Sequence, residues 1–187
     1  MTGPSGAGKG TLIRSLLDRR DDLQVAISAT TRPRRPGEAE GVHYYYLDDE
    51  AFDAKVAAGE FLEHVDFVAG HRYGTLNDEV DRVLASGTSC VLELETAGAK
   101  RVKRLRPRAV TIFVQAPTFA ELERRLRERA TESAGEIGER LDLARRQIAE
   151  AGDFDHVITN DDVERAAGEL EDVVREELGT AATLRRR

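Results

Sequence analysis

The chain has 187 residues and a mass of 20.7 kDa, which leaves room for one compact domain with small inserted subdomains and excludes two large domains. With 40% hydrophobic and 34% charged residues, it has the composition of a globular protein rather than of a disordered or fibrous one. The formal net charge of −7 disfavours indiscriminate binding to nucleic acid or to an anionic membrane, so any anion site is expected to be local.

Cysteine usage and the lengths of the apolar runs bear on the cellular location. The single cysteine, Cys90, cannot form an internal disulfide, which favours a reducing compartment, and no Cys/His spacing of the zinc-binding type occurs. The apolar runs are far shorter than the roughly 20 residues that span a bilayer, and the N-terminus lacks a targeting pattern. We expect a cytoplasmic protein without membrane or nucleic-acid partners.

The first half of the chain opens with a Gly-rich loop at residues 3–11, followed by a helix that runs to about Asp21. Alternating apolar residues predict a strand over 23–29, and the Pro-, Arg- and Gly-rich stretch 30–40 predicts an irregular connection. Two helical patterns, at about 49–58 and 77–86, end at Gly59 and Gly87. Between these helices we predict only a polar, aromatic stretch.

The second half alternates strands with helices. Nearly continuous apolar runs at 90–94 and 110–114 predict strands buried on both faces, and a weaker run lies at 157–159. Helical patterns cover 119–130, where Thr118 and Glu121 are placed for a capping box, and roughly 136–151 and 163–178. This alternation predicts an α/β domain with a mainly parallel sheet. The arginines at 185–187 are expected to be disordered.

The Gly-rich loop carries the strongest chemical signal. Its glycines permit a tight wrap that directs successive backbone N–H groups at phosphate oxygens, and Lys9 adds a full positive charge. The following helix contributes its positive end. The loop therefore predicts a phosphate-binding P-loop made of Gly3, Pro4, Ser5, Gly6, Ala7, Gly8, Lys9, Gly10 and Thr11.

One position of this loop departs from the general motif. Gly10 follows the lysine, and the hydroxyl that usually contacts Mg²⁺ arrives one residue later, on Thr11. Thr11 is the candidate metal ligand, and we expect phosphates and water to hold most of the ion. A glycine in this slot resembles the nucleoside monophosphate kinases.

A second cationic cluster follows the first predicted strand. Arg32, Arg34 and Arg35 are joined within a dozen residues by Tyr44, Tyr45 and Tyr46. Guanidinium groups bind phosphate bidentately and phenolic groups donate a further hydrogen bond, so the cluster predicts a second phosphate site. A solvated charged loop is the alternative. Two phosphate sites in one chain imply a phosphoryl acceptor.

Two further groups of charged residues complete the candidate site. Glu93 and Glu95 are expected at the carboxyl end of a buried strand, on the same side, where they could steer Mg²⁺-bound water or accept bonds from a base. Arg125 and Arg129 share a helix face, and Arg140 follows after a short connection that could hinge. A solvated helix is the alternative. In a phosphoryl-transfer enzyme such arginines would arrive with a closing lid.

Taken together, these motifs resemble those of the guanylate kinase family. The resemblance extends from Gly3 to about Leu178, with motifs in the family's order and spacing. They comprise Gly-Pro-Ser-Gly-Ala-Gly-Lys-Gly-Thr at 3–11, Ser28 to Glu38, Tyr44, Glu60-Phe-Leu-Glu63, Tyr73-Gly74-Thr75, Leu92 to Gly98, Arg129-Ala-Thr-Glu and Asn160-Asp161.

The resemblance implies a P-loop NTPase fold, a three-layer α/β/α core with a mainly parallel sheet plus small NMP-binding and lid subdomains. It implies direct in-line transfer of the γ-phosphoryl group from Mg²⁺-bound ATP to GMP, with Lys9, Arg32, Arg125, Arg129 and Arg140 in catalysis. Asn160 would approach adenine. The implied GMP-binding residues are Arg32, Arg35, Tyr44 and Tyr73 at the phosphate and Ser28, Glu63, Thr75, Glu93 and Glu95 at guanine.

The implied organisation is one domain. Its core comprises about 1–29, 76–120 and 147–180, the NMP-binding insert about 30–75, the lid about 121–146 and a tail 181–187. Four departures from the family stand out: Glu95 in place of Asp, Ala97 in place of Gln, Ala130 in place of Gly, and a P-loop that begins at residue 3 without the usual preceding strand. From the missing strand before the P-loop we expect the true start of the protein to lie upstream of residue 1.

Two other functions remain open from the sequence. A non-catalytic guanylate-kinase-like module would use the acceptor groove for a peptide, although it would have no reason to keep an ATP cradle. A related kinase would accept another phosphorylated molecule, such as AMP or a phosphorylated sugar. The sequence leaves the oligomeric state open.

Overall fold

The computed structural model describes residues 1–66, 70–129 and 134–185, with only the backbone described at 129, 134–136 and 180–185. The chain divides into two compact units, residues 1–20 with 108–187, and residues 21–107. We call them unit 1 and unit 2 and describe each by itself.

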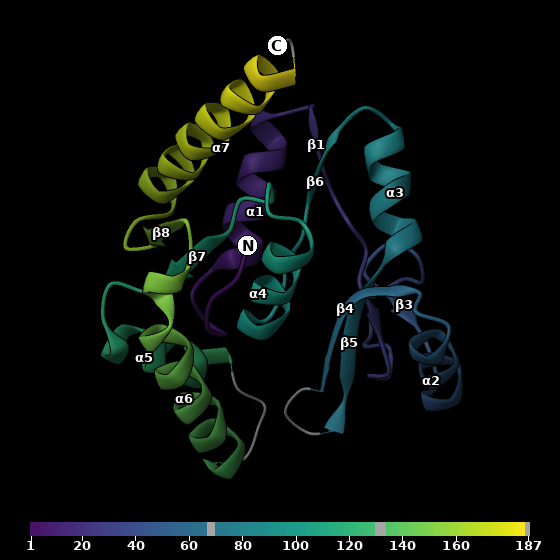
Figure 1. Ribbon diagram of the computed structural model, residues 1–187. Helices are drawn as coiled ribbons and strands as arrows, with labels where there is room; N and C mark the ends of the chain where they lie inside the picture. Colours follow the sequence, from purple (N-terminus) through teal and green to yellow (C-terminus); the bar gives the residue numbers. More distant parts are fainter. Residues whose placement is uncertain (67–69, 130–133, 186–187) are drawn as a thin grey trace. The chain divides into compact units, whose positions relative to one another are not determined.

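Unit 1 is built on two parallel strands, β7 (Ile112–Gln115) and β8 (His156–Thr159), paired from Ile112↔His156 to Gln115↔Thr159. Just before the Gly-rich loop, Thr2 forms an isolated parallel bridge with Phe113. Helices α1 (Lys9–Arg19) and α7 (Val163–Arg185) lie side by side (Figure 1). The apolar core of unit 1 is formed by side chains of these strands and of the inward helix faces. Its fully buried side chains include Leu12, Leu16, Phe113, Val114, Leu122, Ile158 and Leu170.

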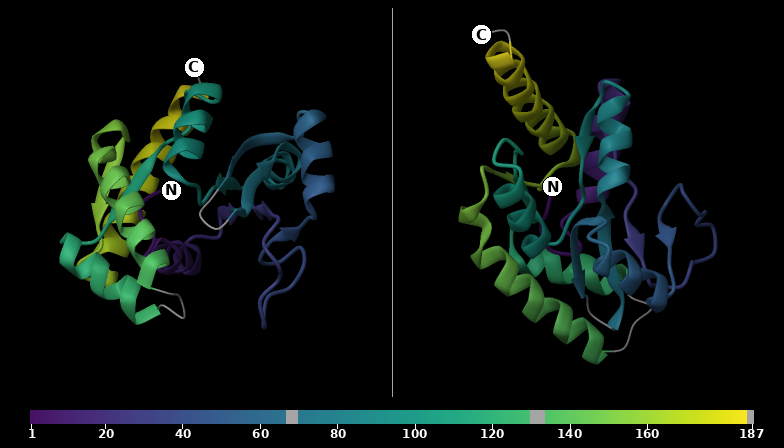
Figure 2. Two further views of the ribbon diagram at one scale, coloured as in Figure 1. Left: turned by 90° about the horizontal axis from the view of Figure 1, so that it is seen from below. Right: turned by 45° about the vertical axis from the view of Figure 1, so that its right-hand side comes forward.

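The remaining helices of unit 1 are α5 (Phe119–Arg129) and α6 (Ala134–Ala149), which pack together (Figure 2), and a 3₁₀ turn, η2 (Ala151–Asp153), follows α6. At the start of α5, the Thr118 hydroxyl accepts a hydrogen bond from the Glu121 N–H at 3.1 Å, as the predicted N-cap requires. The helix predicted over 163–178 continues to Arg185, the first of the three arginines expected to be disordered, and the other two lie outside the described residues.

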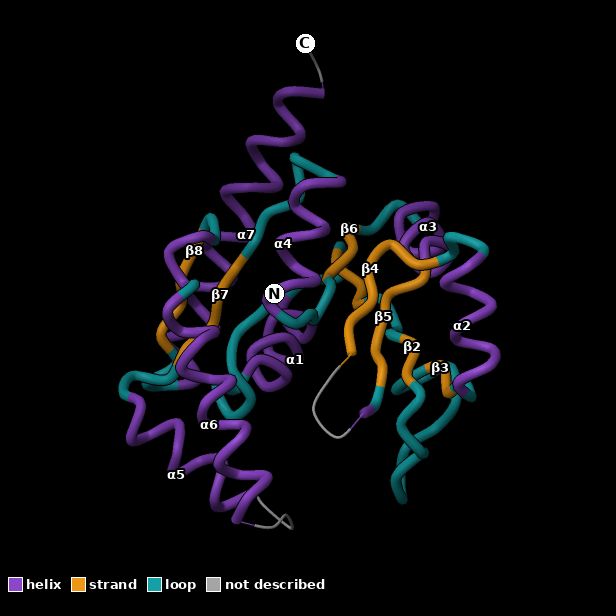
Figure 3. Tube along the Cα trace, turned by 60° about the horizontal axis from the view of Figure 1, so that its bottom comes forward, coloured by secondary structure: helices purple, strands orange, loops and turns teal. Residues whose placement is uncertain are grey.

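Unit 2 contains two sheets. Strands β1 (Leu23–Val25) and β6 (Ser89–Val91) form a parallel pair, with helices α3 (Asn77–Ala85) and α4 (Thr96–Leu105) in the same unit. The second sheet has the order β3-β2-β5-β4 (Figure 3), formed by β2 (Ala29–Thr30), β3 (Tyr45–Tyr46), β4 (Phe61–Asp66) and β5 (Arg72–Leu76). Its β2–β3 pair is parallel, whereas β5 pairs antiparallel with β2 and β4.

Helix α2 (Asp49–Ala57) packs on this four-stranded sheet through Phe52, whose ring stacks on Phe61 with centroids 4.5 Å apart. The Asp48 carboxylate caps α2 by accepting from the Ala51 N–H at 2.8 Å. Gly59 and Gly87 follow α2 and α3 with positive φ, as predicted for residues that end helices. The small apolar cluster around Phe52 therefore holds the hairpin β4–β5 in place.

Several sequence predictions were wrong in unit 2. The strand expected over 23–29 is two strands in different sheets, because the Ile27 N–H bonds the Glu79 carboxylate at 2.9 Å instead of a neighbouring strand. Strand β6 ends at Val91 and is half-buried rather than buried on both faces. The hairpin β4–β5 was not predicted, because polar residues interrupt the apolar alternation of its strands. Helix α4 was not predicted because its buried face consists of small residues apart from Val102. The chain has a mixed α/β fold, with parallel pairs in every sheet.

No helix within the described part of the chain is long and apolar enough to cross a membrane.

Candidate functional site

In unit 1, the Gly-rich loop has the conformation that the sequence predicts. Gly3 and Gly8 have φ of +139° and +91°, which L-residues with side chains rarely adopt. A Cβ at Gly3 would lie 2.0 Å from the Val114 carbonyl oxygen, and one at Gly8 would lie 2.2 Å from Asn160 Nδ2. The loop passes so close to β7 and to the end of β8 that these two positions accept only glycine.

Lys9 and the start of α1 supply positive charge to the loop. The Lys9 ammonium donates to the carbonyl oxygens of Gly3 at 2.9 Å and Pro4 at 3.3 Å. Gly8 is the N-cap of α1, and the described structure has no acidic residue in the first turn of this helix and no side-chain cap. The helix N-terminus therefore keeps its positive potential for an external anion.

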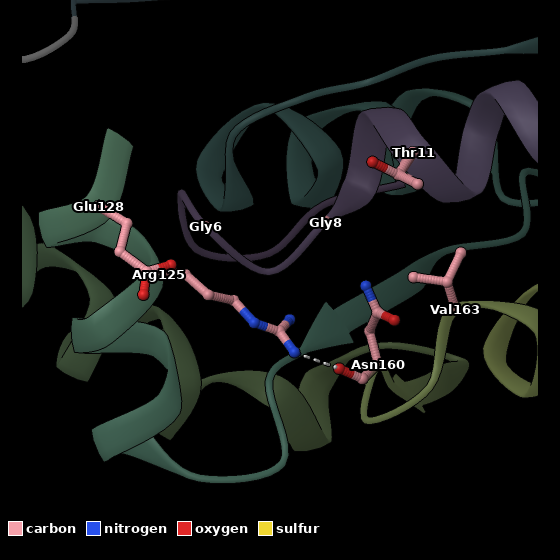
Figure 4. A pocket seen from close by; sticks show the side chains of 7 residues that line it. All are labelled: Gly6, Gly8, Thr11, Arg125, Glu128, Asn160 and Val163. Atoms are coloured by element: carbon pink, nitrogen blue, oxygen red, sulfur yellow. Dashed lines mark hydrogen bonds between the residues drawn. The ribbon is translucent and has the colours of Figure 1, made fainter. Parts of the chain in front are cut away.

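A cavity of about 270 Å³ adjoins the loop. Figure 4 shows Arg125 directed across it toward Asn160, with the two joined by a hydrogen bond from Arg125 Nη2 to the Asn160 carbonyl oxygen at 3.2 Å. The cavity is lined by Gly6, Gly8, Thr11, Arg125, Glu128, Asn160 and Val163. A nucleotide phosphate could enter where backbone N–H groups, a hydroxyl and a guanidinium converge.

Asn160 connects β8 to the loop. Its side chain is only 3% exposed and donates from Nδ2 to the Ala7 carbonyl at 2.9 Å, and its backbone N–H donates to the Gln115 carbonyl at 2.7 Å. Its Oδ1 is buried without a hydrogen-bond partner among the described residues. The family resemblance implies a place near adenine for Asn160; in the structure its amide also supports the loop backbone.

Replacing Asn160 with alanine is expected to destabilise unit 1. The Ala7 carbonyl would lose its buried donor, and leaving such a group unpaired costs roughly 1–3 kcal/mol. Chemical denaturation of the N160A variant should show this loss in the free energy of unfolding. Asp162, two residues further on, is exposed, and its carboxylate accepts from the Arg165 N–H at 2.9 Å at the start of α7. D162N offers the control, because asparagine keeps this acceptor, and it should change stability by less than about 1 kcal/mol. Equal stabilities of N160A and wild type would contradict the assigned contact.

The other candidate cations of unit 1 lie on α5 and α6. Arg140 donates from Nη2 to the Ser5 hydroxyl at 3.2 Å, which links α6 to the Gly-rich loop. Arg125 also donates from Nε to Glu121 at 2.7 Å, and Arg124 together with Arg125 lowers the pKa of the Glu121 carboxyl to about 2. The Arg129 side chain lies outside the described residues, as does Ala130. Arg125 and Arg140 are thus brought to the same loop.

In unit 2, Arg32 lies at the centre of the arginine–tyrosine cluster. It is 7% exposed, donates to the Pro33 carbonyl and to Glu38 at 2.7 Å each, and its guanidinium carbon lies 5.3 Å from the centre of the Tyr44 ring. The Tyr44 ring makes edge contacts with Tyr46 and Tyr73 at centroid distances of 5.9 and 6.0 Å. Arg35 is exposed on the same loop. The predicted second cationic cluster is therefore assembled within unit 2.

Glu63 and Thr75 face each other across the hairpin β4–β5. They are register partners, and the Thr75 hydroxyl donates to Glu63 Oε1 at 2.9 Å. Both side chains are almost fully buried. Burial raises the pKa of the Glu63 carboxyl, while the Thr75 hydrogen bonds and the Arg101 guanidinium oppose that shift. A buried carboxylate with two oxygen acceptors suits a ligand that presents adjacent N–H groups.

The remaining predicted residues of unit 2 occupy loops. Ser28 stands between β1 and β2, and its carbonyl accepts from the Tyr45 N–H at 2.9 Å. Glu93 and Glu95 were expected at a strand end but lie beyond it, in the connection that leads into α4, where Glu95 is the N-cap residue. The negative charge of Glu95 contributes to the raised pKa of Glu63. Glu93 is exposed.

Gly98 allows Glu63 to take up its position. A Cβ at residue 98 would lie 2.5 Å from Glu63 Oε2, closer than any real contact allows. We expect G98A to displace this carboxylate and to weaken binding of its ligand at least about tenfold. The matched control is G168A on α7, where nothing lies within 4 Å of an added Cβ and binding should not change. Isothermal titration of both variants with GMP, the ligand that the family resemblance implies, tests the expectation, and equal affinities would contradict it.

The described residues contain no cluster of three or more His, Cys, Asp or Glu side chains that could hold a metal ion. Thr11 is the candidate ligand and lines the cavity beside the Gly-rich loop. This donor set fits Mg²⁺ bound mainly through phosphate and water, because Mg²⁺ keeps most of its water ligands.

Comparison with known proteins shows the family of the chain. The family model described as "Guanylate kinase" matches residues 1–177. The chain belongs to the guanylate kinase family. The guanylate kinase of Frankia casuarinae is 48% identical over 170 residues, covering 91% of this chain and 92% of that protein. The guanylate kinase of Thermosynechococcus vestitus is 46% identical over 174 residues, covering 93% and 91%.

A solved guanylate kinase structure shares the fold as well. The crystal structure of guanylate kinase from Anaplasma phagocytophilum superposes with a TM-score of 0.74 at 29% identity, over 94% of this chain and 82% of that one. The resemblance inferred from the motifs is thereby confirmed. Two residues beside the predicted site residues were assigned no role from the sequence: Glu38, which bonds Arg32, and Gly98, which lies next to Glu63. The Pro36-Gly37 pair before Glu38 signals a turn but not its contacts.

Proposed function

We propose that the chain is an ATP:GMP phosphotransferase, a guanylate kinase that transfers the γ-phosphoryl group of ATP directly to GMP. One observation carries this assignment beyond family membership. In unit 1, Arg125 and Asn160 line the cavity beside the Gly-rich loop, and Arg140 bonds Ser5 of that loop. In unit 2, Arg32 packs against the Tyr44 ring and Thr75 bonds Glu63. These two groups of contacts support separate donor and acceptor sites. ATP and GMP are the expected partners.

At the donor site, the N–H groups of the Gly-rich loop and the N-terminus of α1 would bind the phosphates of ATP, and Lys9 would leave its carbonyl partners for them. Thr11 would hold Mg²⁺ together with phosphate and water, and bound Mg²⁺ would supply positive charge against the phosphates. Arg125, Arg129 and Arg140 would stabilise the charge that spreads over the transferred group.

At the acceptor site, Arg32, Arg35, Tyr44 and Tyr73 would hold the GMP phosphate. Guanine presents N1–H and N2–H side by side, and the Glu63 carboxylate can accept from both, whereas adenine has an acceptor at N1. Rejection of adenine would be strong, because the buried carboxylate would be left unpaired. Ser28, Thr75, Glu93 and Glu95 would complete the guanine pocket.

The finer architecture belongs to this proposal. It comprises a single domain with a three-layer α/β/α core, an NMP-binding insert at about 30–75 and a lid at about 121–146. The cytoplasmic location stays a prediction from cysteine usage.

The test is ADP release with Mg²⁺-ATP and a panel of acceptors: GMP, dGMP, AMP and phosphorylated sugars. We expect turnover with GMP to exceed that with AMP by at least about a hundredfold. Turnover with another acceptor but not GMP would favour a related kinase. Binding of GMP without any turnover would favour a non-catalytic binding module.

A further inference from the structure

The Glu38 carboxylate joins three donors of the arginine–tyrosine cluster. Its Oε1 accepts from Arg32 Nη2 at 2.7 Å, and its Oε2 accepts from the Arg35 N–H at 2.7 Å and from the Tyr46 hydroxyl at 2.8 Å. A carboxylate at this place is unexpected, because its neighbours are residues expected to bind a phosphate. Its contacts indicate a role within the cluster.

The backbone around Glu38 forms a tight turn. The Glu38 N–H donates to the Arg35 carbonyl at 3.1 Å, which closes the turn Arg35-Pro36-Gly37-Glu38. Gly37 has φ of +85°, the conformation that the third residue of a type II turn requires, and proline is favoured at the second position. The Glu38 side chain returns to the first residue of the turn, so backbone and side chain fix the loop together.

Arg32 is held on more than one side. Glu38 and the Pro33 carbonyl each take one N–H of its guanidinium, and the group lies over the Tyr44 ring. A guanidinium has five N–H donors, so donors remain for a phosphate beyond the bonds to Glu38, Pro33 and Tyr73. A long, flexible side chain fixed in advance loses less conformational entropy when it binds a ligand.

We propose that Glu38 is a positioning residue for the acceptor phosphate: it holds the Arg32 guanidinium and the turn that carries Arg35 in the geometry that binds this phosphate. This inference rests on the proposed function. Glu38 acts through Arg32 and the turn and does not itself touch the nucleotide.

A competing interpretation makes Glu38 a stand-in for the phosphate, which GMP would have to displace. The contacts favour positioning. Two of the three Glu38 partners are the Arg35 backbone N–H and Tyr46, and neither belongs to the side chains expected at the phosphate. A stand-in would instead occupy the Arg35 guanidinium, Tyr44 and Tyr73. The two interpretations predict opposite effects when the carboxylate is removed.

The test compares E38Q with E40Q. Glu40 lies on the same loop, and its carboxylate accepts from the Tyr46 backbone N–H at 3.0 Å, so it is the matched control. E38Q turns an amide N–H group toward donors of the cluster and removes the negative charge that pairs with Arg32. We expect the KM for GMP to rise at least about tenfold in E38Q, with the KM for ATP and the binding of guanosine unchanged, because guanosine lacks the phosphate. E40Q should match wild type.

A second variant guards against a folding defect. Y46F removes one of the three donors and keeps the Arg32–Glu38 ion pair, so we expect a rise in the KM for GMP of about two- to fivefold and an unchanged thermal midpoint. A lower KM for GMP in E38Q would establish the stand-in instead. The proposal would also be overturned by equal KM values for GMP in E38Q and E40Q. An equal loss of guanosine binding and GMP binding in E38Q would overturn it as well.

Calorimetric titration with GMP separates this inference from the proposed function. Wild type that binds GMP but releases no ADP would refute the kinase assignment, while the GMP affinities of E38Q, Y46F and E40Q would still test Glu38. Wild type that binds no GMP would overturn both.

Discussion

The K9A variant is expected to lose at least about a thousandfold in kcat while its affinity for GMP stays within about twofold of wild type. Lys9 brings an ammonium group to the Gly-rich loop, where it donates to the Gly3 and Pro4 carbonyls of unit 1. GMP is expected to bind residues of unit 2. The loss should therefore fall on transfer rather than on acceptor binding, as initial-rate kinetics and GMP titration would show.

The control for this variant is K55A. Lys55 pairs with Glu60 at 2.7 Å on the surface of unit 2, and exposed ion pairs contribute little. K55A should keep wild-type turnover. A K9A variant that retains more than about a tenth of the wild-type kcat would show that the loop does not carry the transferred phosphate. Loss of GMP affinity in K9A would contradict the separate assignment of the two sites.

The E63Q variant is expected to lose at least about tenfold in kcat/KM for GMP and to discriminate less against AMP. A glutamine of the same size keeps one acceptor for the Thr75 hydroxyl but turns an N–H group toward the guanine donors. Two donors facing each other cannot bond. Steady-state kinetics with both acceptors gives the measurement, and an effect below about twofold would contradict the assignment of guanine to Glu63.

The same substitution should stabilise the ligand-free protein at neutral pH. Burial raises the pKa of Glu63, so folding favours the protonated form of this carboxyl, and its ionisation above that pKa costs stability. The cost is greatest above the raised pKa and disappears as the pH falls through it toward the ordinary value. Glutamine carries no charge and avoids this cost.

Thermal unfolding as a function of pH tests this expectation. The midpoint of E63Q should exceed that of wild type at about pH 8, and the difference should shrink as the pH is lowered. The control is E60Q, because Glu60 lies nearby but is exposed. A difference that grows on acidification would show that the Glu63 carboxylate stabilises the fold.

The two sites differ in how much of each could be predicted from neighbouring residues in the chain. The Gly-rich loop could be predicted from its motif alone, because the residues that define it are close together in the chain. Its backbone conformation and charge come from Gly3, Gly6, Gly8 and Lys9. The acceptor site differs, because Glu63 and Thr75 come from strands that the periodicity did not reveal. Only the family resemblance pointed to them, and the hairpin explains why both are buried together.

The amino-acid sequence by itself determined the phosphate-binding loop, most of the helices and the cluster of arginines and tyrosines, because each depends on neighbouring residues or on one periodic face. The tertiary structure decided that residues 23–29 divide between two sheets, that Gly98 makes room for the Glu63 carboxylate, and that Glu38 ties Arg32 to a turn. These arrangements depend on contacts between segments far apart in the chain or on the orientation of a side chain. Burial, close approach and hydrogen-bond geometry, rather than local propensity, select them.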